Sequence, residues 1–194
     1  MLLRPPAQEE PLFPLETLIM QELTPITTDG PTLHVDASPW GGGAVLFLEG
    51  QPAEYAIMRW TPEDAKTLGT EIGQPAGQTA WEYAALLLAM CVWGRECNGT
   101  GLAVLGDNLA SLNGLLSGRG RGTLNKLTRE MAWRKVRHRW KFAAGHLPSE
   151  VNNLADALSR LSAPLGSEQK SFPAELRAAL SRDAPQLQDI WTCS

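Results

Sequence analysis

Apolar and polar residues alternate along residues 32–60 in three short segments, and this pattern predicts three β-strands. In the first, residues 32–38, Leu33, Val35 and Ala37 share one face and Asp36 points to the other. Residues 44–48 and 53–60 form the second and third, and the turns between them contain glycine. Short turns between such strands favour an antiparallel meander.

The pattern then changes to alternating helices and strands. We expect a loop over residues 61–78 and then a helix from Thr79 to about Glu96, apolar almost all round and therefore buried. A strand, a helix, a basic helix, a strand and a last helix follow; their ranges are 101–106, 107–116, 124–138, 140–144 and 149–161. This order predicts a mixed α/β sheet with helices on its faces.

The start of the last helix can be predicted from two residues. Pro148 disfavours helix before it, and Ser149 is a suitable N-cap. Its buried stripe is expected to consist of Val151, Leu154, Leu158 and Leu161. Asp156 falls on the opposite, polar face.

Proline content divides the chain into three parts. Residues 1–31 contain six of the 14 prolines and are interpreted as a linker or the remnant of an upstream domain. Residues 32–161 form the predicted domain. Residues 162–194 are interpreted as a proline-punctuated tail with one possible helix from Pro173.

Composition favours an intracellular protein. The longest apolar run, residues 84–93, is too short for a membrane span of about 20 residues, and the N-terminus has no secretory signal pattern. The three cysteines have neither metal-ligand nor disulfide spacing. We therefore expect a cytoplasmic or nuclear protein that is neither secreted nor membrane-bound.

Positive charge is concentrated in one segment although the net charge is −4. Nine of the 17 basic residues and one acid lie within residues 119–141, which carry +8 and leave −12 elsewhere. The basic residues are Arg119, Arg121, Lys126, Arg129, Arg134, Lys135, Arg137, Arg139 and Lys141. Such a patch binds polyanions locally, unless it is an ordinary solvated helix face.

Four acids lie on four different predicted elements: Asp36, Glu82, Asp107 and Asp156. Each has an ordinary explanation by itself: a wet edge strand, a helix-dipole contact, a helix N-cap or a solvated helix face. Together they suggest a site for hard divalent cations, which prefer oxygen ligands. Two such ions a few ångströms apart need carboxylates from several elements.

The sequence resembles a type 1 ribonuclease H domain, in particular those attached to retroelement reverse transcriptases. The motifs are Val35-Asp36-Ala37-Ser38 with its glycine-rich turn, Trp81-Glu82, Gly106-Asp107-Asn108, and Gly145-His146 ahead of Asn153-Leu154-Ala155-Asp156-Ala157-Leu158-Ser159-Arg160. Gly106 departs from the serine or threonine that often precedes the third acid. The resemblance implies a mixed five-stranded sheet, a three-strand antiparallel meander plus two parallel strands, with helices on both faces.

The same resemblance implies an endoribonuclease that cuts the RNA strand of RNA–DNA hybrids, leaving 3′-hydroxyl and 5′-phosphate ends. Two Mg²⁺ ions, with Mn²⁺ as substitute, are expected: one on Asp36 and Asp156, the other on Asp36, Glu82 and Asp107. His146 resembles the family histidine that assists proton transfer or product release. An upstream reverse transcriptase domain and a retroelement particle belong to this interpretation.

Substrate contacts are expected from residues near the acids and from the basic segment. Ser38 and Asn108 are candidates for reading the 2′-hydroxyl, and Arg119, Arg121, Lys126, Arg129, Arg134, Lys135 and Arg137 for binding phosphates. The alternatives are a catalytically silent connection module of a reverse transcriptase, and a transposase or integrase core. Retention of all four acids disfavours the first, and the Gly-His to Ala-Asp arrangement disfavours the second.

Overall fold

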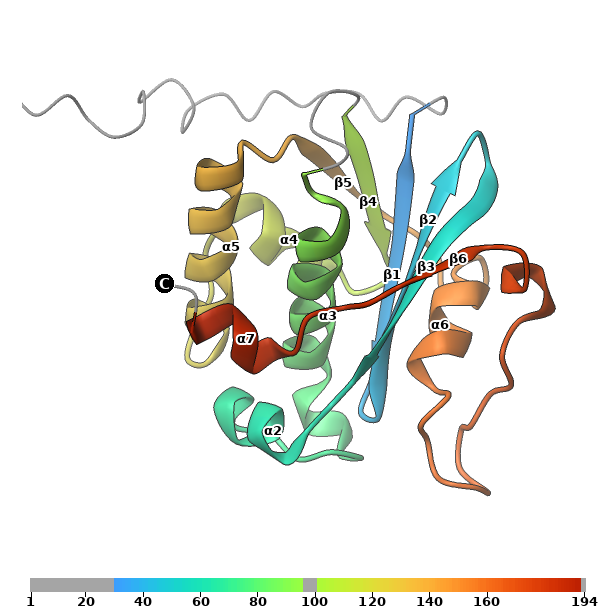
Figure 1. The fold of residues 1–194 in the computed structure, drawn as a ribbon. Helices are drawn as coiled ribbons and strands as arrows, with labels where there is room; N and C mark the ends of the chain where they lie inside the picture. Colours follow the sequence, from blue (N-terminus) through green and yellow to red (C-terminus); the bar gives the residue numbers. More distant parts are fainter. Residues whose placement is uncertain (1–29, 96–100, 193–194) are drawn as a thin grey trace, which may run out of the picture.

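A central strand, β1, organises the sheet of the computed structural model, which describes residues 30–95 and 101–192 (Figure 1). The strands are β1 (Thr32–Ser38), β2 (Gly41–Leu48), β3 (Gln51–Arg59), β4 (Leu102–Gly106), β5 (Phe142–His146) and β6 (Leu180–Arg182). Their order is β5-β4-β1-β2-β3-β6. β1, β2 and β3 pair antiparallel, whereas β4 pairs parallel with both β1 and β5. The predicted meander and parallel pair are confirmed.

Within the described residues the sheet has six strands rather than the predicted five. The additional strand, β6, lies in the segment interpreted as a tail and pairs parallel with β3, where Glu54 is opposite Leu180. Three residues are too few to show an alternating pattern, so β6 could not be predicted from apolar periodicity. The possible helix from Pro173 is only a 3₁₀ turn, η2 (Ala174–Leu176).

Helices cover both faces of the sheet, as predicted. They are α2 (Pro62–Leu68), α3 (Gln78–Trp93), α4 (Leu109–Ser117), α5 (Leu124–His138), α6 (Asn153–Ser159) and α7 (Leu187–Thr192). In Figure 1, α6 lies on one side of the sheet and the other helices lie on the opposite side. No helix among the described residues is long and apolar enough to cross a bilayer.

The expectation of a loop over residues 61–78 was wrong, because this segment contains α2 and a 3₁₀ turn, η1 (Pro75–Gly77). The Thr61 hydroxyl accepts from the Asp64 backbone amide at 3.2 Å, and the Asp64 carboxylate accepts from the Thr61 amide at 2.8 Å. Pro62 occupies the first helical position. This capping box was readable in Thr-Pro-Glu-Asp, with aspartate in place of the usual glutamate.

Helix α3 is buried along most of its length, as its all-round apolar character predicted. It begins at Gln78 rather than Thr79, and residues 81–90 together with Trp93 are buried. The main core lies between this helix and the sheet, with Leu33 and Val35 of β1 contributing from the sheet side. Glu82, in the second turn of α3, is therefore placed in the interior.

Helix α6 lies so close to the sheet that β2 needs glycine there. A Cβ added at Gly43 would collide with the Ala155 carbonyl oxygen and come within 2.5 Å of the Leu158 Cβ. A smaller core of Val45, Leu158 and Leu176 fills the space beside this contact. β1 is thus covered on both faces, which excludes the edge-strand explanation of Asp36.

The start of the last helix was predicted incorrectly. The amides of Val151 and Asn152 donate to the Pro148 carbonyl at 2.9 and 3.2 Å, forming a turn, and α6 begins only at Asn153. Val151 is consequently not part of the buried stripe and is 60% exposed. The Asn152 side-chain amide, which is buried, donates to the Val35 carbonyl at 3.0 Å and ties this turn to β1.

Candidate metal centre

Three of the four acids meet where β1 and β4 diverge. β1 leads into β2 on one side, whereas the chain after β4 passes through α4 and α5 to β5 on the other. Such a reversal point commonly forms a binding crevice. Asp36 comes from β1, Asp107 follows β4, and Glu82 reaches them from α3. One carboxylate oxygen from each lies within 4.8 Å of the others.

Two of the three carboxylates in the cluster are buried, and the third, Asp107, is half-buried. Asp36 and Glu82 are each only 4% exposed. Burial, together with the charges of Asp156 and Asp107, raises the pKa of Asp36 to about 7. Burial and the charges of Asp36 and Asp107 raise the pKa of Glu82 well above its ordinary value. Because like charges in low dielectric destabilise one another, a bound cation would relieve this repulsion.

Each carboxylate is oriented by a hydrogen bond from a neighbour. Ser159 Oγ donates to Asp36 Oδ2 at 2.6 Å, and Gln78 Nε2 donates to Glu82 Oε1 at 2.7 Å. Ser149 Oγ donates to Asp107 Oδ2 at 2.8 Å. Such partners fix the direction in which ligand oxygens point.

Sequence reasoning did not identify these three supporting residues. Gln78 was detectable, because it precedes Glu82 by four residues and thus shares its helix face. Ser159 was quoted only as part of a motif. Ser149 was interpreted as a helix cap, whereas its hydroxyl bonds to Asp107. Nothing in the local pattern signals a contact between residues 42 positions apart.

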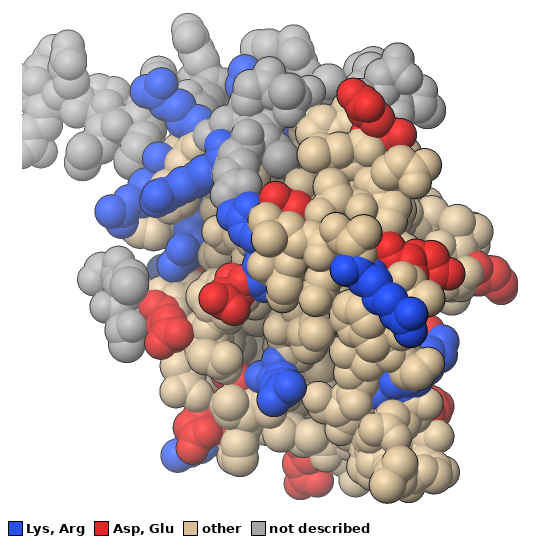
Figure 2. Space-filling view, turned by 45° about the vertical axis from the view of Figure 1, so that its right-hand side comes forward, with Lys and Arg blue, Asp and Glu red and all other residues tan. Residues whose placement is uncertain are grey.

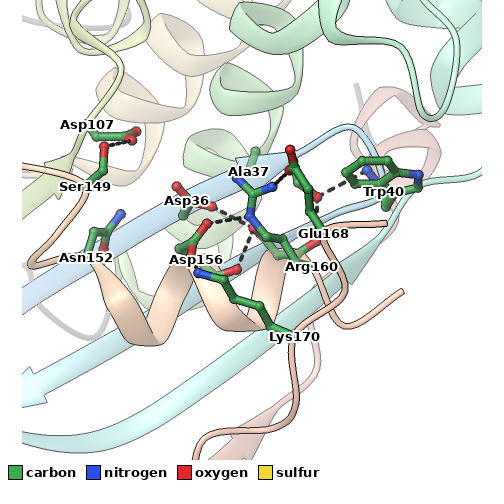
Figure 3. A network of polar contacts seen from close by, with 12 residues as sticks. Asp36, Ala37, Trp40, Asp107, Ser149, Asn152, Asp156, Arg160, Glu168 and Lys170 are labelled. Atoms are coloured by element: carbon green, nitrogen blue, oxygen red, sulfur yellow. Dashed lines mark hydrogen bonds and ion pairs between the residues drawn. The ribbon is translucent and has the colours of Figure 1, made fainter. Parts of the chain in front are cut away.

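Asp156 lies beside this cluster but faces two basic side chains (Figure 3). Arg160 Nε donates to Asp156 Oδ1 at 2.6 Å, and Lys170 Nζ donates to Asp156 Oδ2. Partial burial by itself raises the pKa of Asp156, but the hydrogen bonds from Lys170 and Arg160 outweigh it and lower the pKa overall. The structure therefore joins Asp156 to the cluster through the field it exerts on Asp36, and pairs its carboxylate with cations of the chain itself.

Asn108 directly follows Asp107, and His146 lies opposite the residue before it, Gly106. His146 ends β5 opposite Gly106 of β4, and its side chain is exposed. Asn108 Oδ1 accepts from the amides of Ala110 and Ser111, each at 3.0 Å. Asn108 is thus the N-cap of α4, which excludes that role for Asp107.

Ser38 does not face the solvent. It is completely buried, and its hydroxyl donates to the Ser159 carbonyl at 2.7 Å. The structure thus places the Ser38 side chain under α6, where it helps to hold the helix that carries Asp156 and Ser159.

The basic segment divides into outward and inward side chains. Arg119, Arg121, Lys126, Arg129 and Arg137 are exposed. Arg134 instead pairs with Glu130 at 2.6 Å and donates to the Ile190 carbonyl of α7 at 3.2 Å. Lys135 lies over the Phe142 ring at 4.9 Å, and burial lowers its pKa. Figure 2 shows basic side chains gathered at the upper left of that view.

Comparison with solved structures identifies the architecture. The chain has no significant match to a protein-family model or to a curated protein. It is similar to RNase H1 from the archaeon Halobacterium salinarum NRC-1, with 17% identity and a TM-score of 0.50 over 68% of this chain and 96% of that one. LC11-RNase H1, isolated from compost, gives 19% identity and a TM-score of 0.51 over 67% and 92%.

The chain has the ribonuclease H fold. This agrees with the fold expected from the motifs around the four acids, apart from the additional strand β6. Within the ribonuclease H fold of this chain, Asp36 is held from two directions: by its place in the central strand and by Ser159 of α6.

Replacing Asp36 with asparagine should stabilise the metal-free protein in a pH-dependent way. The amide keeps an acceptor for Ser159 but removes a buried charge. Between the ordinary pKa of 3.8 and the raised value of about 7, the folded wild type retains a proton that the unfolded chain loses, so its stability falls as the pH rises. The advantage of Asp36→Asn should grow across this window and reach the order of a few kcal/mol, because one pKa unit corresponds to about 1.4 kcal/mol.

Urea unfolding in the presence of a chelator, at pH values from 4 to 8, measures this difference, with the exposed Asp183→Asn as the matched control. A wild type as stable as Asp36→Asn at pH 8 would show that the cluster carries no electrostatic strain.

Proposed function

We propose that this chain is a metal-dependent endoribonuclease that cleaves the RNA strand of RNA–DNA hybrids and leaves 3′-hydroxyl and 5′-phosphate ends. The observation that carries the proposal is the convergence of Asp36, Glu82 and Asp107, with ligand atoms within 4.8 Å of one another, on a ribonuclease H fold. A tight group of acids from three distant segments, with Asp36 and Glu82 buried, is costly for stability, so a binding role accounts for it better than a structural one.

The donor set fits hard divalent cations. All three ligands are carboxylates, which suit Mg²⁺ and its substitute Mn²⁺, and no thiol or imidazole is among them. Asp36, Glu82 and Asp107 would hold one ion, and Asp36 and Asp156 a second. When bound, such ions stabilise negative charge on the phosphate and on the leaving oxygen, and they make a coordinated water more acidic.

The chain's own residues keep the carboxylates in position for this chemistry. Ser159 and Gln78 donate to Asp36 and Glu82 from opposite sides of the sheet. The Ser149 hydroxyl likewise donates to Asp107. We assign His146, exposed at the end of β5, to proton transfer or product release.

The exposed basic residues provide the phosphate contacts in this proposal. Arg121 lines an open pocket of about 540 Å³ together with Thr70, Gln74 and Thr79. Thr79 belongs to the first turn of α3, three residues before Glu82. The pocket therefore connects the basic segment with the helix that supplies a ligand. Asn108, directly after Asp107, is our candidate for contact with a 2′-hydroxyl.

The biological setting is also a proposal. The motif over residues 153–160 resembles ribonuclease H domains of retroelement reverse transcriptases, so we place the activity beside an upstream polymerase domain, with residues 1–31 as the connection. An intracellular site of action, cytoplasmic, nuclear or within a retroelement particle, follows from that setting.

Cleavage of a labelled RNA–DNA hybrid is the direct test of the proposed activity. With Mg²⁺ or Mn²⁺ the wild type should cut the RNA strand only, and end analysis should find 5′-phosphates. Asp36→Asn and Glu82→Gln should each lower the rate at least about 100-fold, because even the outer partners of metal ligands are worth about 10- to 100-fold. Asp183→Asn, far from the cluster in sequence and exposed, should retain the wild-type rate.

A wild type that binds hybrid but never cuts it would support the silent connection module instead. Cutting that persists in Asp36→Asn would place the activity elsewhere.

Removal of two outward basic residues of α5 should weaken hybrid binding without weakening the fold. For Arg129→Ala/Arg137→Ala we expect the slope of log affinity against log salt to fall by about 2, because each lost phosphate contact removes close to one released counterion. Binding titrations at several salt concentrations measure the slope, with Lys66→Ala as the control.

Arg134→Ala should behave differently, because the Arg134 guanidinium pairs with Glu130 on the same helix and joins α5 to the Ile190 carbonyl of α7. Arg134→Ala should lower the unfolding temperature more than the double variant does.

Unchanged affinity and an unchanged salt slope in Arg129→Ala/Arg137→Ala would show that this face of α5 is not part of the substrate interface.

A further inference from the structure

The segment after α6 returns to the fourth acid and pairs with it. Lys170 Nζ contacts Asp156 Oδ2, while Asp156 Oδ1 accepts from Arg160 Nε at 2.6 Å. Arg160 also pairs with Glu168, two residues before Lys170. Figure 3 shows these four side chains as one network at the edge of the acidic cluster. Both oxygens of the fourth acid are thus occupied by basic groups of the chain itself.

Lys170 is held near Asp156 by anchors on both sides. On its N-terminal side, Glu168 is tied to Arg160 of α6. On its C-terminal side, the Phe172 ring meets the Tyr55 ring of β3 edge-on, with centroids 5.3 Å apart. Leu176 is then buried in the smaller core. A tethered ammonium group has a high effective concentration at its partner, so free cations must compete with it.

The two basic partners of Asp156 differ in how easily they can leave. Arg160 sits four residues further along from Asp156, and its side chain is 23% exposed. The Lys170 side chain is 48% exposed and reaches Asp156 from a loop. An exposed lysine pair is weak, so it can be displaced by a divalent cation that binds the same carboxylate.

We propose that Lys170 is a built-in competitor for the second divalent cation: it occupies Asp156 in the metal-free protein and is displaced when that ion binds Asp36 and Asp156. This inference rests on the proposed function, which assigns Asp156 to the second ion. Within the described residues, the side chains that donate to Asp36, Glu82 and Asp107 are uncharged: they are Ser159, Gln78 and Ser149. The two metal sites should therefore differ in affinity, with Lys170 weakening only the second.

Calorimetric titration of the metal-free full chain with Mn²⁺ tests the proposal. The wild type should show one tighter and one weaker site. Lys170→Gln should tighten the weaker site about 2- to 5-fold, the range expected for loss of an exposed ion pair, and leave the tighter site unchanged. Lys170→Arg should restore weak binding, because it keeps the charge, and Lys66→Gln should match the wild type at both sites.

A variant that lacks the Asp156 carboxylate distinguishes direct competition at Asp156 from a general effect of the Lys170 charge. In Asp156→Asn the weaker site should be absent, and adding Lys170→Gln should then change nothing. Equal tightening of both sites by Lys170→Gln would overturn the proposal, because it would reveal only a long-range charge effect.

Thermal unfolding gives a second readout that does not depend on activity. In chelator, Lys170→Gln should unfold at a lower temperature than the wild type, since it loses the pair with Asp156, and saturating Mn²⁺ should abolish this difference. A weaker site unaffected by Lys170→Gln, with hybrid cleavage intact, would overturn the competitor role and leave the proposed function standing. Absence of any Mn²⁺ binding would overturn both.

Discussion

The mutual repulsion of three neighbouring carboxylates, two of them buried, is the constraint on which the rest of this structure depends. Asp36 and Glu82 are almost inaccessible to solvent, and Asp107 is close enough to raise the pKa of both. Such a cluster opposes folding in the absence of a cation, so the surrounding scaffold has to hold it in place. The main core under α3 and the close contact between α6 and β2 provide that stability. The acidic site is thus a local cost that the rest of the fold offsets.

The scaffold holds the site from both faces of the sheet. Glu82 comes from α3 on one face, whereas Ser159 and Asp156 come from α6 on the other, and Asp36 in the central strand lies between them. Gly43 permits α6 to approach closely enough for Ser159 to reach Asp36. A change that shifts either helix should therefore alter the site even if it leaves the acids untouched. The segment after α6 adds Lys170 to this arrangement and makes the environment of Asp156 unlike that of the other three acids.

Sequence reasoning succeeded where the residues of one element share a face, or where the order of the elements along the chain is simple. Alternation around Val35 identified the meander, and the unbroken apolar character of α3 identified a buried helix. The convergence of Asp36, Glu82 and Asp107 was anticipated because each sits on a different predicted element of an α/β sheet. Sequence reasoning failed at α2, whose capping box was overlooked, and at β6, which is too short to show an alternating pattern.

Local sequence patterns could not predict the hydrogen bonds and ion pairs around the acids, because these contacts join segments that are distant in the sequence. Ser149 bonds to Asp107 across 42 positions, and Ser159 bonds to Asp36 across 123. Lys170 was part of an apparent tail, and only the folded return of that segment brings it to Asp156.

The central claim is that Asp36, Glu82 and Asp107 hold a divalent cation between them. A crystal grown with Mn²⁺ and measured at the manganese absorption edge locates that ion directly. We predict an anomalous peak within coordinating distance, about 2.0–2.3 Å, of one oxygen from each of the three carboxylates. Well-ordered carboxylates with no peak between them, in a crystal saturated with Mn²⁺, would contradict the account.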